Sequence, residues 1–188
     1  MLGKILKKED CAKCRFCCAF RPCSQWETPI FTQENYQAIE GRQDKTLAEG
    51  TKACNVGPLY KLDNVSDVNY YRYSLKEAYK TDDPEEEAPC PYLDKDKGCL
   101  LNDQQKPWDC KIWPLRVVRK TDDSLWIVLT PTCPSVNKLD IEEVRSFVVN
   151  ELKDQLADYA RKHPALIKED KEDFFIYLVE MESGVVGM

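Results

Sequence analysis

The chain of 188 residues has little glycine and a single histidine, and these shortages exclude several common sites. No two of its seven glycines are separated by one residue, so the sequence has neither a G-x-G phosphate-binding turn nor a Walker loop. With His163 as the only histidine, a catalytic zinc site built from several histidines is excluded. Nothing in the sequence places a nucleophile near His163, so we expect no catalytic role for it.

The sequence also lacks a long hydrophobic run and a positive net charge. No apolar stretch approaches the roughly 18 residues of a membrane helix, and residues 1–10 do not contain the apolar core of a secretion signal. The net charge of -6 disfavours binding to nucleic acid or to an anionic membrane surface. We therefore expect a cytoplasmic protein that binds neither nucleic acid nor membrane.

Length and hydrophobic pattern predict an α+β fold in one small domain, residues 1–188. Thr32 predicts the start of a short helix that ends at Gly41. Partial alternation of apolar and polar residues predicts β-hairpins in residues 59–75 and 115–130. Between these elements we expect irregular loops that carry the cysteines.

The C-terminal part, residues 135–188, is predicted to be mainly helical. A long amphipathic helix begins at Asp140 and ends before Pro164, because proline disfavours helix at the residue before it. Its apolar stripe has helical spacing and comprises Ile141, Val144, Phe147, Val148, Leu152, Leu156 and Tyr159. Residues 173–181 fit either a helix or a strand, and we favour a helix.

Cysteine is unusually abundant, with ten residues, and four of them lie within residues 11–18. In the cytoplasm this density favours metal binding over disulfides, because thiols there are kept reduced. The first group has the pattern C-x2-C-x2-C-C and comprises Cys11, Cys14, Cys17 and Cys18. Thiolates two residues apart can bind one ion, as in zinc knuckles and iron–sulfur sites. The adjacent Cys17 and Cys18 tend to point apart, which indicates either two centres or one ligand and one spectator.

Four later cysteines supply the remaining ligands of the expected site: Cys90, Cys99, Cys110 and Cys133. The two groups together provide eight sulfurs, enough for two four-thiolate sites. Basic residues are concentrated in residues 1–23 and again around Cys110, where they favour the thiolate that binds metal. Cys23 and Cys54 stand outside these groups, and we assign them to the core or the surface.

Two other interpretations of the cysteines remain open. Reduced cysteines can pack as small apolar side chains without any metal. The cysteines could instead form the disulfide framework of a secreted protein, although the sequence shows no secretion signal.

The order of the cysteine blocks along the chain also favours metal binding. The blocks read CAKCRFCC at residues 11–18, CPYL at 90–93, GCLLNDQQKPWDCKIWP at 98–114 and CP at 133–134. This signature region, residues 11–134, resembles the bacterial CxxCxxCC cysteine-cluster family of zinc- or iron-chelating domains, with Lys106 and Lys111 in the places of two arginines. The resemblance implies metal or cluster binding by the matched cysteines. It also relates the chain to a region of flagellin lysine N-methylase.

Three functional hypotheses follow. The first is a metal-binding protein that holds Zn²⁺ or an iron–sulfur cluster, with a 4Fe–4S cluster as one form. The second is an iron–sulfur-dependent redox or methyl-transfer enzyme. For methyl transfer the chain is short, and it has no recognisable S-adenosylmethionine loop. The third is a metal chelator or carrier, for which exposed sulfurs with labile binding are expected.

Overall fold

The computed structural model describes residues 2–40, 56–62, 68–75, 87–94, 96–171 and 173–182. The chain packs as two compact units: unit 1 contains Met1–Cys11 and Lys111–Met188, and unit 2 contains Ala12–Cys110. The single domain predicted from the sequence stays a prediction, because this division does not test whether the units fold independently. Helices and sheets are both present, as the predicted α+β class requires. None of the described helices combines the length and apolar character that a bilayer crossing requires.

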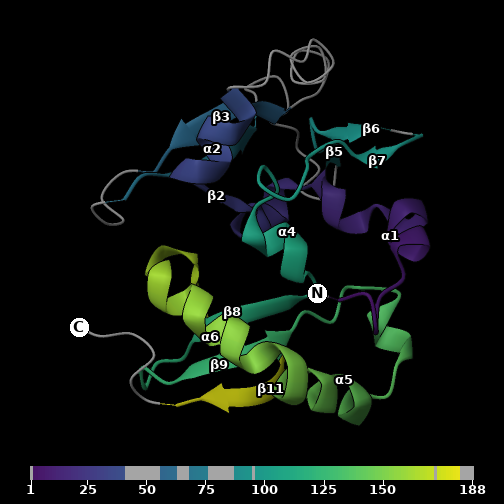
Figure 1. Ribbon diagram of the computed structural model, residues 1–188, viewed down its shortest axis with the longest axis vertical. Coiled ribbons are helices and arrows are strands. Elements are labelled where there is room, and N and C mark those ends of the chain that lie inside the picture. The colour runs from purple at the N-terminus through teal and green to yellow at the C-terminus, as the bar shows by residue number, and fades with distance from the viewer. Residues whose placement is uncertain are drawn as a thin grey trace. The chain divides into compact units, whose positions relative to one another are not determined.

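Unit 1 contains a four-stranded sheet in the order β10-β8-β9-β11 (Figure 1). Strands β8 (Leu115–Arg119) and β9 (Leu125–Leu129) form an antiparallel hairpin, which confirms the hairpin predicted in residues 115–130. Strand β11 (Ile176–Met181) pairs antiparallel with β9. The short strand β10 (Lys168–Glu169) pairs parallel with β8 and completes the sheet.

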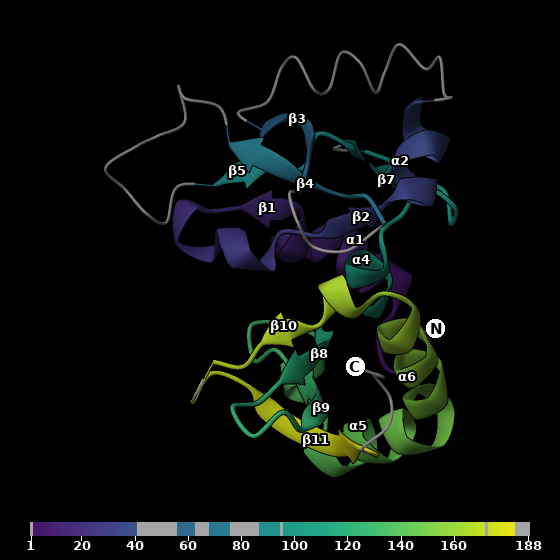
Figure 2. The same ribbon diagram turned by 90° about the vertical axis from the view of Figure 1, so that its left-hand side faces the viewer.

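Helical residues cover one face of this sheet (Figures 1 and 2). They form three consecutive segments: α5 (Ile141–Phe147), the π-helical turn η5 (Val148–Leu152) and α6 (Lys153–Lys162). The carboxylate of Asp140 caps the first segment by accepting a 2.7 Å hydrogen bond from the Glu142 backbone N–H. Four residues of the predicted apolar stripe are buried: Val144, Val148, Leu152 and Leu156. The π-helical turn is a feature that the apolar spacing does not predict.

The core of unit 1 is aliphatic. Its side chains come from the sheet, from the helical segments and from the short 3-10 turn η4 (Val136–Lys138). A second short turn, η6 (Pro164–Leu166), follows the end of α6. The almost fully buried aliphatic residues include Leu115, Val118, Ile127, Val128, Leu129, Val136, Val144, Val148 and Leu156.

The prediction of a helix in residues 173–181 is wrong, because most of this segment is strand β11. β11 pairs with β9 along one edge, with a register shift between Tyr177 and Val179, and Leu178 at this shift is buried. The ring of Tyr177 also makes an edge-on contact with Trp126 on β9, with 5.5 Å between the ring centroids. Aromatic and β-branched residues fit such a paired, half-buried position. Residues 135–188 therefore contain strands as well as helices.

Unit 2 contains a three-stranded antiparallel sheet in the order β2-β4-β3 (Figure 2). Strand β4 (Tyr70–Leu75) lies between β2 (Ile30–Thr32) and β3 (Val56–Lys61). The pairing of β3 with β4 confirms the hairpin predicted in residues 59–75.

Helix α2 (Gln33–Glu40) follows β2 directly and confirms the predicted short helix. The Thr32 hydroxyl accepts a 3.3 Å hydrogen bond from the Asn35 backbone N–H, as expected of a residue that starts a helix. The predicted stop at Gly41 lies outside the described residues.

Short elements make up the rest of unit 2. They are η1 (Phe16–Cys18), β1 (Ala19–Phe20), η2 (Pro22–Glu27), β5 (Ala88–Pro89), β6 (Leu93–Asp94) and β7 (Gly98–Cys99). Helices α1 (Lys8–Cys14) and α4 (Trp108–Ile112) each contain one boundary between the units. The buried core cluster of unit 2 is mainly aromatic and comprises Phe20, Phe31, Tyr73, Ala88 and Tyr92.

Candidate metal centre

Cys18 and Cys90 lie opposite each other because of the ribbon formed by β1 and β5. Ala19 pairs with Pro89 in this antiparallel ribbon, so the residue before β1 meets the residue after β5. The Cys90 backbone N–H donates a 2.7 Å hydrogen bond to the Cys18 carbonyl and extends the ladder by one step. Strand pairing thus brings together cysteines from the two groups seen in the sequence.

The thiols of Cys17 and Cys18 are hydrogen-bonded to each other at the end of the turn η1. This bond is the main reason why the pKa of Cys18 falls to about 7, against the opposing effect of burial. The positive charges of Lys106 and Arg15 also lower it. The expectation that Cys17 and Cys18 point apart is wrong, because their side chains interact. Cys18 is partly ionised at neutral pH, which is the form that binds a metal.

The pKa values of the Cys90 and Cys110 thiols are raised, whereas that of Cys18 is lowered. Burial raises the pKa of Cys90 to about 12 and that of Cys110 well above its ordinary value. Negative charge on Cys18 and Cys99 raises the pKa of Cys90 further, and negative charge on Cys90 and Cys18 raises that of Cys110. These sulfurs therefore lie within electrostatic range of one another. We call Cys17, Cys18, Cys90, Cys99 and Cys110 the thiol group.

Cys110 is held in place by buried polar contacts of its neighbours. Asp109 is buried and accepts a 3.0 Å hydrogen bond from the Ile30 backbone N–H on β2. Gln105 is only 2% exposed, and its Nε2 donates a 3.0 Å hydrogen bond to the Ala38 carbonyl on α2. Because breaking a buried hydrogen bond is costly, these contacts fix the segment that carries Cys110 against β2 and α2.

Cys99 reaches the thiol group through the ribbon of β6 and β7. It pairs with Leu93, which lies shortly after Cys90 in the chain. Gly98 has a φ of +78°, a left-handed conformation that glycine adopts without strain from a Cβ atom. The tight ribbon therefore returns the chain so that Cys99 lies beside the segment of Cys90.

Sequence reasoning missed Tyr73 on β4. Its hydroxyl lies 3.9 Å from the Cys90 Sγ, at the limit for a hydrogen bond to sulfur. Burial raises the pKa of Tyr73 well above its usual value, so the hydroxyl keeps its proton and can donate to a Cys90 thiolate. The ring is fixed by contacts with Phe20 and Phe31, with centroids 5.3 Å and 5.2 Å away. Nothing local in the sequence relates Tyr73 to a cysteine, because tertiary packing alone brings them together.

The other cysteines have different environments. Cys14 is exposed at the end of α1 and lines a cavity in unit 2. Cys11 and Cys133 belong to unit 1, so their part in the site stays a prediction. Cys23 is exposed, and its assignment outside the metal site stays a prediction; Cys54 lies outside the described residues.

The donors of the thiol group suit a soft metal. Thiolate sulfur is the preferred ligand of zinc and of iron–sulfur clusters, and none of the nine described cysteines is in a disulfide. As they stand, no three Cys, His, Asp or Glu side chains among the described residues are close enough together to hold a metal ion. A bound metal would therefore have to draw these sulfurs closer together.

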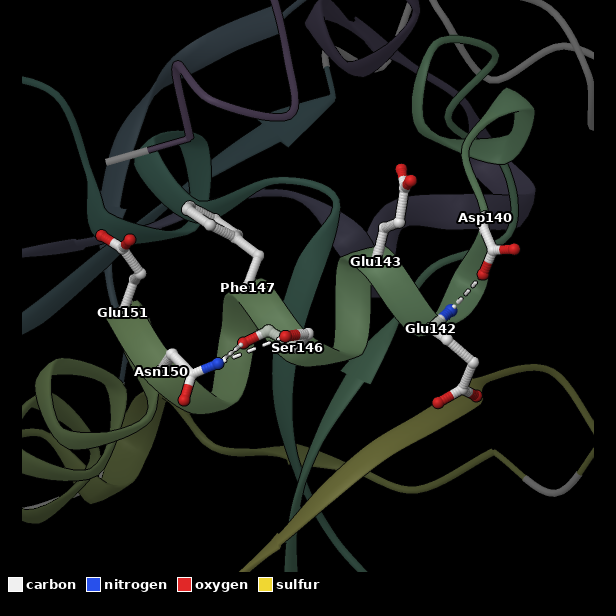
Figure 3. Close-up of a pocket in the computed structure, with 7 residues that line it drawn as sticks. All are labelled: Asp140, Glu142, Glu143, Ser146, Phe147, Asn150 and Glu151. Atoms are coloured by element: carbon white, nitrogen blue, oxygen red, sulfur yellow. Dashed lines mark hydrogen bonds between the residues drawn. The ribbon is translucent and has the colours of Figure 1, made fainter.

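A separate hollow of about 560 Å³ lies along α5 and η5 in unit 1 (Figure 3). Its acidic lining residues are Asp140, Glu142, Glu143 and Glu151. Asp140 caps α5, Glu142 forms a 3.3 Å ion pair with Arg145, and Glu151 forms an ion pair with Lys4. Contacts within unit 1 thus account for most of these carboxylates, and we do not assign a site to this hollow.

Comparison with known proteins finds no relative. No family model, curated protein or solved structure matches this chain. The likeness to the CxxCxxCC family therefore rests on the cysteine blocks alone, and the geometry of the thiol group carries the functional argument.

Proposed function

We propose that this chain is a metal-binding protein that holds Zn²⁺ or an iron–sulfur cluster through its clustered cysteines. The observation that carries the proposal is the thiol group. Cys18, Cys90 and Cys110 come from segments far apart in the sequence, yet the Cys90 backbone N–H is bonded to the Cys18 carbonyl, and the charges of Cys18 and Cys90 both raise the pKa of Cys110. Convergence of thiols from separate segments is the arrangement that a thiolate-bound metal requires.

Packing alone is a weaker explanation of the thiol group. Cysteines that serve only as small apolar side chains are buried, whereas Cys17 and Cys99 are exposed and Cys18, Cys90 and Cys110 are only partly buried. Burial is the main cause of the raised pKa values of Cys90 and Cys110, and repulsion from neighbouring thiolates adds to it. A bound cation removes that repulsion and makes ionisation of these thiols favourable.

The proposal gives a reason for the irregular loops of unit 2. An ion bound by the thiol group would crosslink the segments around Cys18, Cys90 and Cys110, of which the first two are otherwise joined by the two-residue ribbon of β1 and β5. Cys14, in the same unit, is a further candidate ligand of this centre, and Cys11 and Cys133 remain candidate metal ligands from the sequence. We further propose that the chain forms one small cytoplasmic domain in which the bound metal crosslinks these loops. Residues 141–162 would be the long amphipathic helix of this domain.

Metal analysis of the purified chain tests the proposal. Protein prepared without oxygen is analysed for zinc and iron and measured for visible absorption, since aerobic purification can replace iron with zinc. We expect at least one metal per chain, with visible bands if the metal is an iron–sulfur cluster. A variant in which Cys18, Cys90 and Cys110 are all changed to Ala should lose the metal. Wild-type protein that contains no stoichiometric metal, whether it is purified without oxygen or in air, would contradict the proposal.

One observation favours a metal chelator or carrier as a second function. Cys14, Cys17 and Cys99 are exposed, and exposed sulfurs exchange metal more readily than buried ones. A carrier should transfer its metal to an apo-protein acceptor faster than the metal dissociates into a chelator-free buffer. An iron–sulfur-dependent redox or methyl-transfer enzyme would additionally require a place for substrate beside the metal.

A further inference from the structure

Two cysteines of unit 2 face each other across the ribbon of β1 and β5 (Figure 2). Cys18 precedes β1 and Cys90 follows β5, and the Cys90 backbone N–H donates a 2.7 Å hydrogen bond to the Cys18 carbonyl. The two cysteines therefore form the next opposed pair after Ala19 and Pro89. Among the described cysteines, no other two are placed opposite each other by strand pairing.

This placement suits a disulfide between Cys18 and Cys90. In an antiparallel ribbon, opposed residues of a hydrogen-bonded pair have Cα atoms about 5.5 Å apart and side chains on the same face. Disulfides span Cα separations of about 4.4 to 6.8 Å, so this bond requires only a small approach of the two side chains. The charge of a Cys18 thiolate also acts on Cys90, which places the two sulfurs within electrostatic range.

The adjacent Cys17 is a poorer disulfide partner for Cys18, although the two thiols are hydrogen-bonded to each other. Both residues belong to the turn η1, and the peptide bond that joins them is trans. Cα atoms across a trans peptide are about 3.8 Å apart, which is below the usual range of disulfides. A bond between Cys17 and Cys18 would therefore distort the turn, whereas a bond from Cys18 to Cys90 would follow the ribbon.

A cavity of about 290 Å³ gives a small reagent access to Cys18. Its lining residues include Cys18, Pro89 and Leu93 but not Cys90. Arg15, also in the lining, precedes η1 and has a φ of 54°, in the left-handed region, where strained residues often mark functional sites. A reagent that enters the cavity therefore meets Cys18, and Cys90 is the second thiol of the pair.

We propose that Cys18 and Cys90 form an oxidation site for hydrogen peroxide and other small hydroperoxides. The Cys18 sulfur attacks one peroxide oxygen, the O–O bond breaks, and the other oxygen leaves as water with the thiol proton. The Cys90 sulfur then attacks the sulfenic acid on Cys18, so that an S–S bond forms, the S–O bond breaks and a second water leaves with the Cys90 proton. The two sulfurs lose the two electrons that the peroxide gains. The reaction uses no bound metal.

The test treats the full chain, purified without oxygen and with its thiols reduced, with a small excess of hydrogen peroxide. Remaining thiols are blocked with N-ethylmaleimide, and mass spectrometry of the digested chain maps the disulfides. We expect a disulfide that joins the peptides of Cys18 and Cys90, and we expect a dithiol reductant to remove it. No disulfide at Cys18, or one that joins Cys18 to Cys17 or Cys14 instead, would overturn the inference.

Variants assign the roles of the two thiols. Cys90→Ala should lose the disulfide and leave sulfenic acid on Cys18, which dimedone labels. Cys17→Ala should keep the disulfide, and so should Cys23→Ala, the matched control at an exposed cysteine on η2. Slow hydrogen exchange in β4 shows that each variant is folded. Equal dimedone labelling of Cys18 in wild type and in Cys90→Ala would contradict the role of Cys90.

A change in the cavity wall tests the route of access. Leu93→Trp narrows the cavity, so it should slow dimedone labelling of Cys18 when it is combined with Cys90→Ala. The slowing should be greater with cumene hydroperoxide, which is larger than hydrogen peroxide. An unchanged rate with both peroxides would contradict access through this cavity.

Elemental analysis of the same preparation separates this inference from the proposed function. A chain that forms the disulfide between Cys18 and Cys90 but contains no metal contradicts the proposed function alone. A chain that contains stoichiometric metal but forms no such disulfide contradicts this inference alone.

Discussion

The two compact units of this chain are held together by different means. Unit 1 packs its helical segments on a four-stranded sheet around aliphatic side chains such as Ile127, Val148 and Leu156. Unit 2 has a small aromatic cluster around Tyr73 and several two-residue strands. The described residues of unit 2 also include seven of the nine described cysteines: Cys14, Cys17, Cys18, Cys23, Cys90, Cys99 and Cys110.

This difference suggests what the cysteines are for. A structure with a large apolar core gains its stability from burial and needs no crosslink, whereas a small one commonly depends on a metal or on disulfides. Unit 2 has the smaller core among the described residues, and none of its described cysteines is in a disulfide. In our account, metal binding supplies to unit 2 the stability that burial supplies to unit 1.

The largest expected effect is that metal removal unfolds unit 2 and spares unit 1. A structural metal contributes on the order of 10 kcal/mol to folding, which exceeds what the aromatic cluster alone can replace. After chelation, hydrogen exchange should become fast at the Cys90 amide, which is bonded to Cys18, and stay slow in β8 and β9. Elemental analysis verifies that the metal has been lost. Unchanged hydrogen exchange in both units after this loss would contradict the claim that unit 2 depends on metal and unit 1 does not.

A substitution in the core of unit 1 should destabilise unit 1 and leave unit 2 and its metal unchanged. Leu156 is 1% exposed on α6, and Leu156→Ala should lower the free energy of unfolding of unit 1 by about 3 kcal/mol through the cavity it leaves. Metal content should stay the same. Val149→Ala, at a side chain that is 44% exposed, is the control and should change stability by less than about 0.5 kcal/mol. Loss of metal in Leu156→Ala would show that the units depend on each other.

Removing one thiol should weaken metal binding without affecting unit 1. If four thiolates share a binding free energy of about 10 to 16 kcal/mol, Cys110→Ala should lower metal affinity by roughly 100-fold. Competition with a coloured chelator measures this affinity. Cys23→Ala, at an exposed cysteine on η2, is the matched control. Equal affinities of the two variants would exclude Cys110 as a ligand.

The smallest expected effect concerns the hydroxyl of Tyr73. Tyr73→Phe removes a hydrogen bond to Cys90 worth about 1 kcal/mol, and should speed metal release by up to about tenfold and shift the sulfur-to-metal absorption. Tyr71→Phe is the matched control on the same strand, because the Tyr71 hydroxyl bonds Gln33 at 2.8 Å instead. A spectral shift of the same size in both variants would show that Tyr73 has no special relation to the metal.

The sequence predicts the parts of the fold that local patterns determine. The hairpin of β8 and β9 follows from two β-branched runs around a polar turn, and α2 follows from Thr32 at its start. Strand β11 is not predicted, because its pairing with β9 is a contact between distant segments. For the same reason the spacing of Val144 to Leu156 indicates a helix but not its π-helical turn.

The candidate site, like the fold, has features that local sequence patterns predict and features that they do not predict. The spacing of Cys14, Cys17 and Cys18 and the later Cys90 and Cys110 predicts converging thiols. Spacing does not predict that β1 and β5 place Cys18 opposite Cys90, since two-residue strands have no signature of their own. The contact of the Tyr73 hydroxyl with Cys90 depends on tertiary packing. The turn at Arg15 depends on its left-handed backbone conformation. No local sequence pattern predicts either feature.

X-ray absorption at the metal edge of the anaerobically purified chain tests the central claim most directly. Convergence of the thiol group on a metal predicts a first shell made of sulfur, at about 2.3 Å from zinc. Cys110→Ala should reduce the number of sulfur neighbours. A first shell of oxygen and nitrogen only, or a chain without metal whose unit 2 is folded, would contradict the account.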